Sequence, residues 1–169
     1  MLKSAPIADA LGGGHVSQFR LLTVGRPRDQ RLAGLVAEYV KRLSPLGLTW
    51  QTVAEVPFKR GQESISQIRE GERLLARIGA RDFVVLLDVK GEQVDSPGLA
   101  QHLERWRKLS RPITVVVGGS AGVSDAVQTR ADWRWSLTPL TLPHGLAQVV
   151  VAEQLYRAWT IGQGHPYHK

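Results

Sequence analysis

The sequence predicts a single α/β domain, built on a mainly parallel sheet with helices on both faces. Short apolar runs alternate with segments of helical periodicity, which is the pattern of strands joined by crossover helices. Residues 83–87 are continuously apolar, as expected of a strand covered on both faces, and residues 113–117 are expected to be another buried strand. A length of 169 residues, with 43% hydrophobic and 22% charged residues, fits one soluble domain with one core.

The first half of the chain is expected to form two strands and two helices. Residues 19–24 are the first strand, and apolar residues from position 32 to 43 recur at helical spacing until Pro45 ends the helix. Residues 48–56 are the second strand. Ser64 and Gln67 have the spacing of a capping box, which predicts a helix that begins there and ends near residue 79.

The second half repeats this alternation. The strand at residues 83–87 is followed by a helix with Ser96 as its N-cap and Pro97 as its first residue, which runs to about residue 106. The strand at residues 113–117 precedes a short helix that starts at Ser124, and residues 133–137 form the last strand. A loop of residues 138–143 then leads into a long helix over residues 145–161.

Residues 1–18 are expected to be a flexible extension outside the fold, or the product of a translation start placed too early. They contain three consecutive glycines, show no sustained periodicity and lack the apolar core of a secretory signal. The predicted domain therefore covers residues 19–169.

Composition narrows the classes of function. The chain has no cysteine, which excludes a disulfide framework, a cysteine nucleophile and a cysteine-based zinc site. No stretch is long and apolar enough for a membrane span, and we expect a cytoplasmic protein. A net charge of +7 and a pI near 10.2 are typical of nucleic-acid binders, although a basic balance also serves solubility.

Two loops after predicted strands are candidate ligand contacts, because ligands of open α/β sheets lie beyond the carboxyl ends of the strands. Residues 118–122 read Gly-Gly-Ser-Ala-Gly, where the paired glycines allow either a close approach to a ligand or a tight turn into the next helix. Residues 138–143 form an apolar loop with two prolines. Such a loop suits an aromatic ring whose polar edge is read by backbone groups, or it is buried by another part of the chain.

The last helix and the tail hold further candidates. Residues 149–152 are apolar all round the helix, which predicts a subunit interface as well as a core contact. Glu153 and Arg157 have the spacing of a surface ion pair. Residues 164–169 combine two imidazoles, a phenol and an amine, so they are either an inert terminus or a site of proton exchange and RNA contact. No third ligand near the two histidines supports a metal site.

Three C-terminal strings closely resemble those of one known family. They are SLTPLTLPH at residues 136–144, VAEQLYRAW at residues 151–159 and HPYH at residues 165–168. Shorter matches occur at residues 21–25, 59–61, 87–88 and 118–119. On these residues the chain resembles the ribosomal RNA large-subunit methyltransferase H family, from about Phe19 to Lys169.

The resemblance implies a SPOUT-class fold, in which the C-terminal part of a parallel α/β domain is threaded into a trefoil knot. General topology rules disfavour knots, so periodicity alone does not predict one. The resemblance also implies a homodimer that binds S-adenosylmethionine in the knot, with no metal ion. The implied reaction is methylation of N3 of a pseudouridine in 23S rRNA, with the assembled ribosome as substrate.

The same match assigns the site residues. The cofactor contacts correspond to Leu87, Gly119, Thr138, Pro139, Leu140, Thr141, Leu142 and Pro143. The N3 proton must leave before or during methyl transfer, which requires a base or a cation that stabilises the oxyanion. The candidates by chemical type are Arg157, His165, Tyr167 and His168.

The sequence departs from the family pattern at three positions. Ala121 replaces a frequent Glu, Gln148 a frequent Arg, and Gly164 a frequent Asn. Backbone contacts dominate around Ala121, so cofactor binding is still expected there, whereas Gln148 removes a positive charge near the site. A non-catalytic ribosome-binding protein with the same fold is the alternative from another class. A nucleotide-dependent oxidoreductase is disfavoured because no GxGxxG fingerprint is present.

Overall fold

The computed structural model describes residues 18–169, and the extension predicted for the first residues lies outside them except for Gln18. Five parallel strands form one sheet in the order β2-β1-β4-β3-β5. The strands are β1 (Phe19–Val24), β2 (Leu48–Val53), β3 (Phe83–Gln93), β4 (Ile113–Val117) and β5 (Trp133–Ser136). The helices are α1 (Gln30–Arg42), η1 (Ser44–Leu46), α2 (Glu63–Leu75), α3 (Ser96–Arg107), α4 (Asp125–Arg130) and α5 (His144–Gly162).

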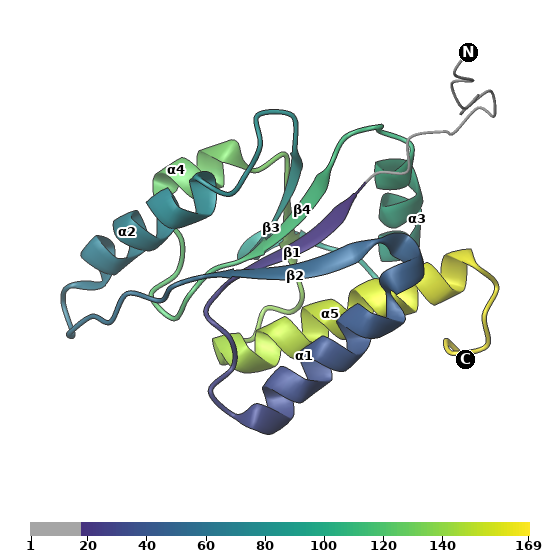
Figure 1. The fold of residues 1–169 in the computed structure, drawn as a ribbon, viewed down its shortest axis with the longest axis horizontal. Helices are drawn as coiled ribbons and strands as arrows, with labels where there is room; N and C mark the ends of the chain where they lie inside the picture. The colour runs from purple at the N-terminus through teal and green to yellow at the C-terminus, as the bar shows by residue number, and fades with distance from the viewer. Residues whose placement is uncertain (1–17) are drawn as a thin grey trace, which may run out of the picture.

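The helices cover both faces of the sheet, as Figure 1 shows, with α1, α3 and α5 on one side and α2 and α4 on the other. Adjacent residues of β1 divide between the two layers, because successive side chains of a strand point to opposite faces. Leu21 packs in the core beneath α1, α3 and α5, and Leu22 packs beneath α2 and α4. The predicted α/β fold with helices on both faces is therefore confirmed.

The C-terminal segment returns across the sheet from its edge. Strand β5 lies at the edge beside β3, and α5 then packs against both α1 and α3. This path is consistent with a threaded C-terminus, and the trefoil knot itself stays a prediction. Within residues 18–169, no helix is both long and apolar enough to cross a membrane.

The apolar stretch of α5 is buried by its own chain. Val149, Val151 and Ala152 all lie in the core formed with α1, α3 and the sheet. Three of the four residues in the stretch that predicted a subunit interface are thus buried within one chain, and Val150 is half-buried. The stretch does not by itself indicate a second copy.

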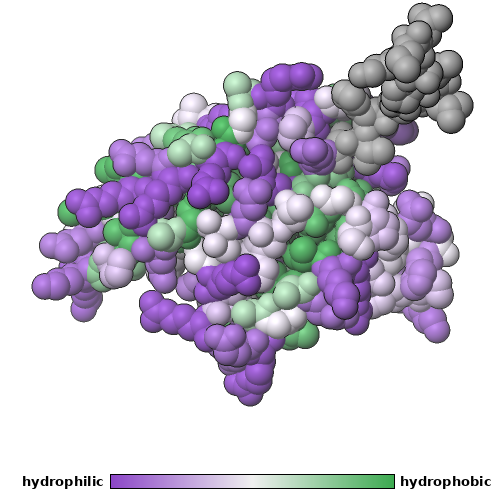
Figure 2. Space-filling model, viewed as in Figure 1, coloured by the Kyte–Doolittle hydropathy of each residue, from purple (hydrophilic) through white to green (hydrophobic). Residues whose placement is uncertain are grey.

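Helix α2 packs with a polar face inward. Its buried residues are Ser66, Glu70, Gly71 and Leu74, whereas Ile65 and Ile68 are exposed. Figure 2 shows hydrophobic residues among hydrophilic ones on the part of the surface where α2 lies in Figure 1. This orientation places polar side chains of α2 beneath the loop that follows β4.

Two helix starts differ from the prediction. Helix α2 begins at Glu63 with no side-chain cap, so the predicted capping box at Ser64 and Gln67 is wrong. The Gln67 amide instead donates to the carbonyl of Ala121, because the helix start lies beside that loop. Helix α3 is capped by Asp95, which accepts from Gly98 N–H at 2.7 Å, and not by Ser96. Helix α4, which was predicted to start at Ser124, starts at Asp125 with Ser124 as its N-cap.

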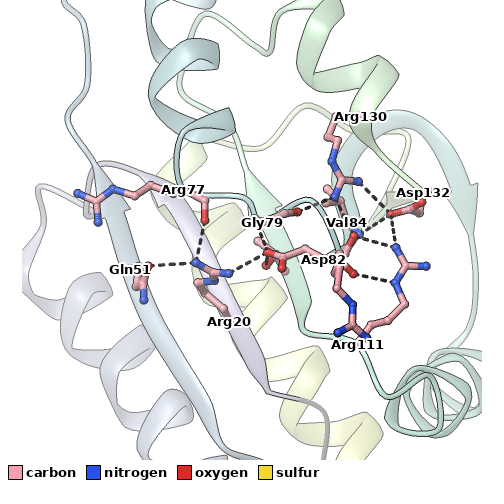
Figure 3. A network of polar contacts seen from close by, with 11 residues as sticks. Arg20, Gln51, Arg77, Gly79, Asp82, Val84, Arg111, Arg130 and Asp132 are labelled. Atoms are coloured by element: carbon pink, nitrogen blue, oxygen red, sulfur yellow. Dashed lines mark hydrogen bonds and ion pairs between the residues drawn. The ribbon is translucent and has the colours of Figure 1, made fainter.

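A polar network closes the amino edge of the sheet (Figure 3). Asp82, just before β3, is buried and accepts hydrogen bonds from Arg20 at 2.8 Å, Thr114 at 2.9 Å and the Gly79 N–H at 3.1 Å. Asp132, just before β5, accepts from the Val84 N–H at 2.8 Å. The charged side chains at this edge form hydrogen bonds that connect neighbouring strands, whereas the carboxyl edge holds a pocket.

Candidate active site

A pocket of about 420 Å³ opens at the carboxyl ends of β3, β4 and β5, a size typical of small-molecule sites. Its walls come from the end of β3 (Leu87, Asp88, Val89, Lys90), the loop after β4 (Val117, Gly118, Gly119, Gly122, Val123) and the loop after β5 (Leu137, Thr138, Leu140, Thr141, Leu142). Gln67, Gln128, Arg134, His144 and Ala147 complete it. Six of the eight predicted cofactor contacts line this pocket, and Pro139 and Pro143 do not.

One wall is a bulge in β3. Leu87 and Glu92 both pair with Trp135 of β5, so the four residues between them protrude from the strand. A Cβ on Gly91 would lie 2.6 Å from the carbonyl of Arg134, which means that only glycine permits this approach to β5. The strand therefore runs past the predicted end at Leu87, and the bulge shapes the pocket.

Asp88 holds the bulge in place. Its carboxylate accepts from the Lys90 N–H at 2.9 Å and from the Arg134 guanidinium through Nε at 2.7 Å and through the neighbouring nitrogen. Burial raises the pKa of Asp88, but the hydrogen bonds from Lys90 and Arg134 outweigh burial and hold it below its usual value. The carboxylate therefore stays charged and is held by these hydrogen bonds, which makes it a poor proton acceptor.

The loop after β4, residues 118–122, is called here the glycine loop. At two of its positions only glycine fits, because neighbouring atoms of the protein occupy the space that a side chain would need. A Cβ on Gly119 would lie 2.6 Å from Glu70 Oε2 and 3.1 Å from Val24 Cγ1. A Cβ on Gly118 would lie 2.5 Å from Val123. The sequence left two explanations for these glycines, a close approach to a ligand and a tight turn into the next helix. The direction of these Cβ positions adds a third reason, which is close packing against the α2 layer.

Glu70 was missed by the sequence analysis and underlies the site. It is 2% exposed, and its Oε1 accepts from the Val56 N–H at 2.8 Å. Ser66, one turn earlier on α2, donates to the Val56 carbonyl at 2.8 Å. Glu70 Oε2 has no hydrogen-bond partner within the described part of the chain. The only sequence signal was the spacing of two polar residues, Ser66 and Glu70, on one face of α2.

The apolar loop after β5 is open in a single chain. Leu140 is 72% exposed, so burial by another part of the same chain, one of the two sequence readings, does not account for it. Leu140 N–H is bonded to the Thr138 hydroxyl at 3.2 Å. Among residues 18–169, the N–H groups of Thr141 and Leu142 have no partner, although both residues line the pocket. They are available to the polar edge of a ligand ring.

Gln148 lies beneath the site and not on its surface. Its side chain is fully buried and donates to the Gly25 carbonyl at 3.2 Å, while its Oε1 has no partner among the described residues. From the sequence, glutamine at this position was expected to remove a positive charge near the site and so to affect RNA affinity. Burial corrects that interpretation, because a side chain here does not face an RNA.

The tail folds back onto α1 and α5. Gly164 has φ of 66°, a left-handed conformation that glycine and asparagine adopt most readily, which explains why either residue suits this position. The Tyr167 hydroxyl lies 3.3 Å from that of Tyr39 and donates to Glu153 Oε1 at 3.1 Å. Burial, followed by the Tyr39 hydrogen bond and the Glu153 charge, raises the pKa of Tyr167 well above its usual range. Tyr167 is thus a phenol that stays protonated.

Arg157 organises the rest of the tail. It pairs with Glu153 at 2.6 Å, as the spacing predicted, and this hydrogen bond raises the pKa of the guanidinium. Its Nη1 lies 3.3 Å from His168 Nδ1. Arginine has no acceptor, so His168 Nδ1 accepts and the proton resides on Nε2. His165 Nδ1 likewise accepts from the Tyr167 N–H at 3.3 Å.

The four catalytic candidates meet one another but not the pocket of their own chain. Arg157, His165, Tyr167 and His168 do not line the pocket, whereas His144, the first residue of α5, does. Helix α5 has 19 residues and is therefore about 28 Å long. Figure 1 shows the C-terminus beyond the end of α5 that lies away from the pocket loops. One chain therefore supplies a pocket and a cluster of proton donors at separate places.

Comparisons with known proteins agree with the resemblance seen in the sequence. A family model described as a predicted SPOUT methyltransferase matches residues 17–168. The chain is 48% identical over 136 residues to the ribosomal RNA large subunit methyltransferase H of Hahella chejuensis, covering 78% of this chain and 86% of that protein. It is 42% identical over 156 residues to the Pseudomonas fluorescens protein of that name, with 90% and 99% covered. A putative member from Methanoregula boonei is 42% identical over 161 residues, with 90% and 99% covered.

Proposed function

Because the chain belongs to the SPOUT methyltransferases, and among them to the ribosomal RNA large subunit methyltransferase H family, we propose that it methylates 23S rRNA with S-adenosylmethionine. The proposed target atom is N3 of a pseudouridine in the assembled ribosome, and the proposed location is the cytoplasm. The observation that carries the proposal is the pocket at the carboxyl edge of the sheet, bounded by the loop after β5.

The residues of the pocket fit this cofactor. The apolar side chains of Leu87, Leu137 and Leu142 suit an adenine ring, and the unpaired N–H groups of Thr141 and Leu142 suit its polar edge. When bound, S-adenosylmethionine supplies the reactive methyl group, so the protein has to align the acceptor and manage one proton. The candidate cofactor contacts are those predicted from the sequence, with Leu87, Gly119 and the pocket-facing part of residues 138–143 foremost.

We propose that the tail works in the pocket of a second copy. The catalytic candidates lie too far from the pocket of their own chain. Of two exposed leucines, Leu140 lines that pocket and Leu146 is next in sequence to the lining residue Ala147. A closed two-fold pair would cover these leucines and bring each tail to the opposite site. This argument for a homodimer replaces the one drawn from residues 149–152.

The arrangement of the tail favours stabilisation of an oxyanion. The guanidinium of Arg157 and the Nε2–H groups of His165 and His168 are all donors in the tail as it lies in this chain. Loss of the N3 proton to water places negative charge on the uracil ring, and fixed donors around that ring lower the energy of the charged form. Tyr167, kept protonated by its surroundings, adds a donor or holds the tail against Tyr39.

A methyl-transfer assay tests the function. Purified protein and radiolabelled S-adenosylmethionine are incubated with ribosomes from cells that lack the modification, and the 23S rRNA is digested for nucleoside mass spectrometry. We expect label in one methylated pseudouridine per large subunit. Cofactor binding without transfer to any ribosomal RNA would instead support the non-catalytic alternative.

A further inference from the structure

The bulge in β3 directs one lysine to the mouth of the pocket. Val89 and Lys90 form its tip, and both are exposed while lining the pocket. Asp88 fixes the backbone of this tip through the Lys90 N–H, and Gly91 allows the bulge to lie directly on β5. The backbone of Lys90 is therefore held in a fixed position, whereas its side chain is exposed to solvent.

Of the lysine and arginine side chains that line the pocket, Lys90 is the one that makes no ion pair within the described part of the chain. Arg134 is engaged by two hydrogen bonds to Asp88, which cancels its charge locally. The Lys90 ammonium makes no ion pair or hydrogen bond with any residue between 18 and 169, although its charge contributes to the lowered pKa of the nearby Asp88 carboxyl. The charges of Arg134 and Asp88 largely neutralise each other, so they attract a charged ligand only weakly. Lys90 therefore carries the net positive charge at the edge of the pocket.

We infer that Lys90 binds a backbone phosphate of the substrate RNA next to the nucleotide that enters the pocket. The inference rests on the proposed function. Lysine binds phosphate as a point charge, and backbone contacts fix the register of a nucleic acid without reading its sequence. Asp88 acts as a positioning residue, because it holds both the tip of the bulge and the competing cation Arg134.

The position of Lys90 favours phosphate over the carboxylate of the cofactor. The interior of the pocket is formed by Leu87, Val117 and the glycine loop, whereas Val89 and Lys90 stand at its exposed edge. A small cofactor occupies the interior, and an RNA strand has to pass over the edge. The two anions can be separated because only the RNA contact depends steeply on salt.

Three variants test this assignment: Lys90→Gln, Lys90→Arg and, as a charge-matched control, Lys108→Gln. Lys108 is an exposed lysine at the end of α3, near the opposite edge of the sheet. Binding to purified 70S ribosomes is measured by co-sedimentation between 50 and 200 mM KCl, concentrations of about the range in which such contacts weaken. Binding of S-adenosylmethionine is measured separately by calorimetry.

We expect Lys90→Gln to weaken ribosome binding roughly fivefold and to reduce the salt slope by about 0.7 to 0.9, as for one lost phosphate contact. Lys90→Arg and Lys108→Gln should retain the wild-type slope, and all three should bind the cofactor as the wild type does. If Lys90→Gln loses cofactor affinity with an unchanged salt slope, the lysine binds the cofactor carboxylate and the inference is wrong. If Lys90→Gln binds ribosomes with the affinity and the salt slope of the wild type, the inference is also wrong. Failure of the wild type to methylate ribosomes would instead refute the proposed function.

Discussion

The substitution Gly119→Ala probes how α2 supports the cofactor loop. The added methyl group would lie 2.6 Å from Glu70 Oε2, about 0.8 Å inside the lower limit of ordinary contact, and 3.1 Å from Val24 Cγ1. Glu70 cannot swing away freely, since it is buried and its other oxygen holds the Val56 N–H. The loop must therefore move toward the pocket, or Glu70 must leave its place.

The expected cost follows from the size of this overlap. Forcing one extra methyl group into a packed site typically costs about 1–3 kcal/mol. If the glycine loop moves to relieve the overlap, the same free energy is lost from cofactor binding, and the affinity falls roughly 5-fold to 150-fold. Gly119→Val should be worse, because its two further methyl groups meet the same neighbours.

A double-mutant cycle separates this mechanism from direct obstruction of the ligand. Cofactor affinity is measured by calorimetry for the wild type, Gly119→Ala, Glu70→Ala and the double variant. Removing the Glu70 carboxylate makes room for the new methyl group, so Gly119→Ala should cost little in the Glu70→Ala background. We expect a coupling free energy of at least about 1 kcal/mol.

Two outcomes would refute this reasoning. If Gly119→Ala binds the cofactor as tightly as the wild type, the close packing against Glu70 does not constrain the loop. If affinity falls equally in both backgrounds, the methyl group blocks the ligand itself and Glu70 is not involved.

Three further predictions concern stability and assembly. Asp82→Ala should lower the free energy of unfolding by about 3 kcal/mol, because it leaves Arg20 without its buried partner at 2.8 Å, and should lower Tm by roughly 10 °C in calorimetry without changing cofactor affinity; an unchanged Tm would contradict this. Because the folded chain raises the pKa of Tyr167, its contribution to stability is present at neutral pH and is lost only as pH rises above about 10. The difference in urea stability between wild type and Tyr167→Phe should thus be constant from about pH 7 to 9 and shrink above about pH 10, and a difference that shrinks at neutral pH would overturn the assignment. Leu146→Glu should shift sedimentation from dimer to monomer at micromolar concentration, whereas an intact dimer would place the interface elsewhere.

Elements covered on both faces could be predicted from the sequence, because burial on both faces leaves short runs that are mainly apolar. Strands β1 and β4 match their predicted bounds because most of their residues are apolar and buried. Strand β3 was predicted too short, since residues 88–93 are mostly polar and pair with β5 only through the close approach at Gly91. A tertiary contact of this kind leaves no periodic signal.

The location of the pocket could be predicted, but not what supports it. The apolar loop of residues 138–143 and the glycine loop were both found, because such composition is unusual after a strand. Glu70 was missed, because a glutamate in a helix is normally exposed. The residue types of the tail indicated proton chemistry, whereas its distance from the pocket depends on the length and direction of α5.

Subunit complementation tests the central claim, that the pocket of one chain is completed by the tail of another. Two differently tagged variants, Gly119→Val and a chain with His165 and His168 changed to alanine, are co-expressed, and doubly tagged dimers are purified for methyl transfer to ribosomes. Each such dimer contains one intact pocket facing one intact tail, so we predict about half of the wild-type activity, although each variant alone is inactive. Mixed dimers as inactive as the two parent variants would contradict the account.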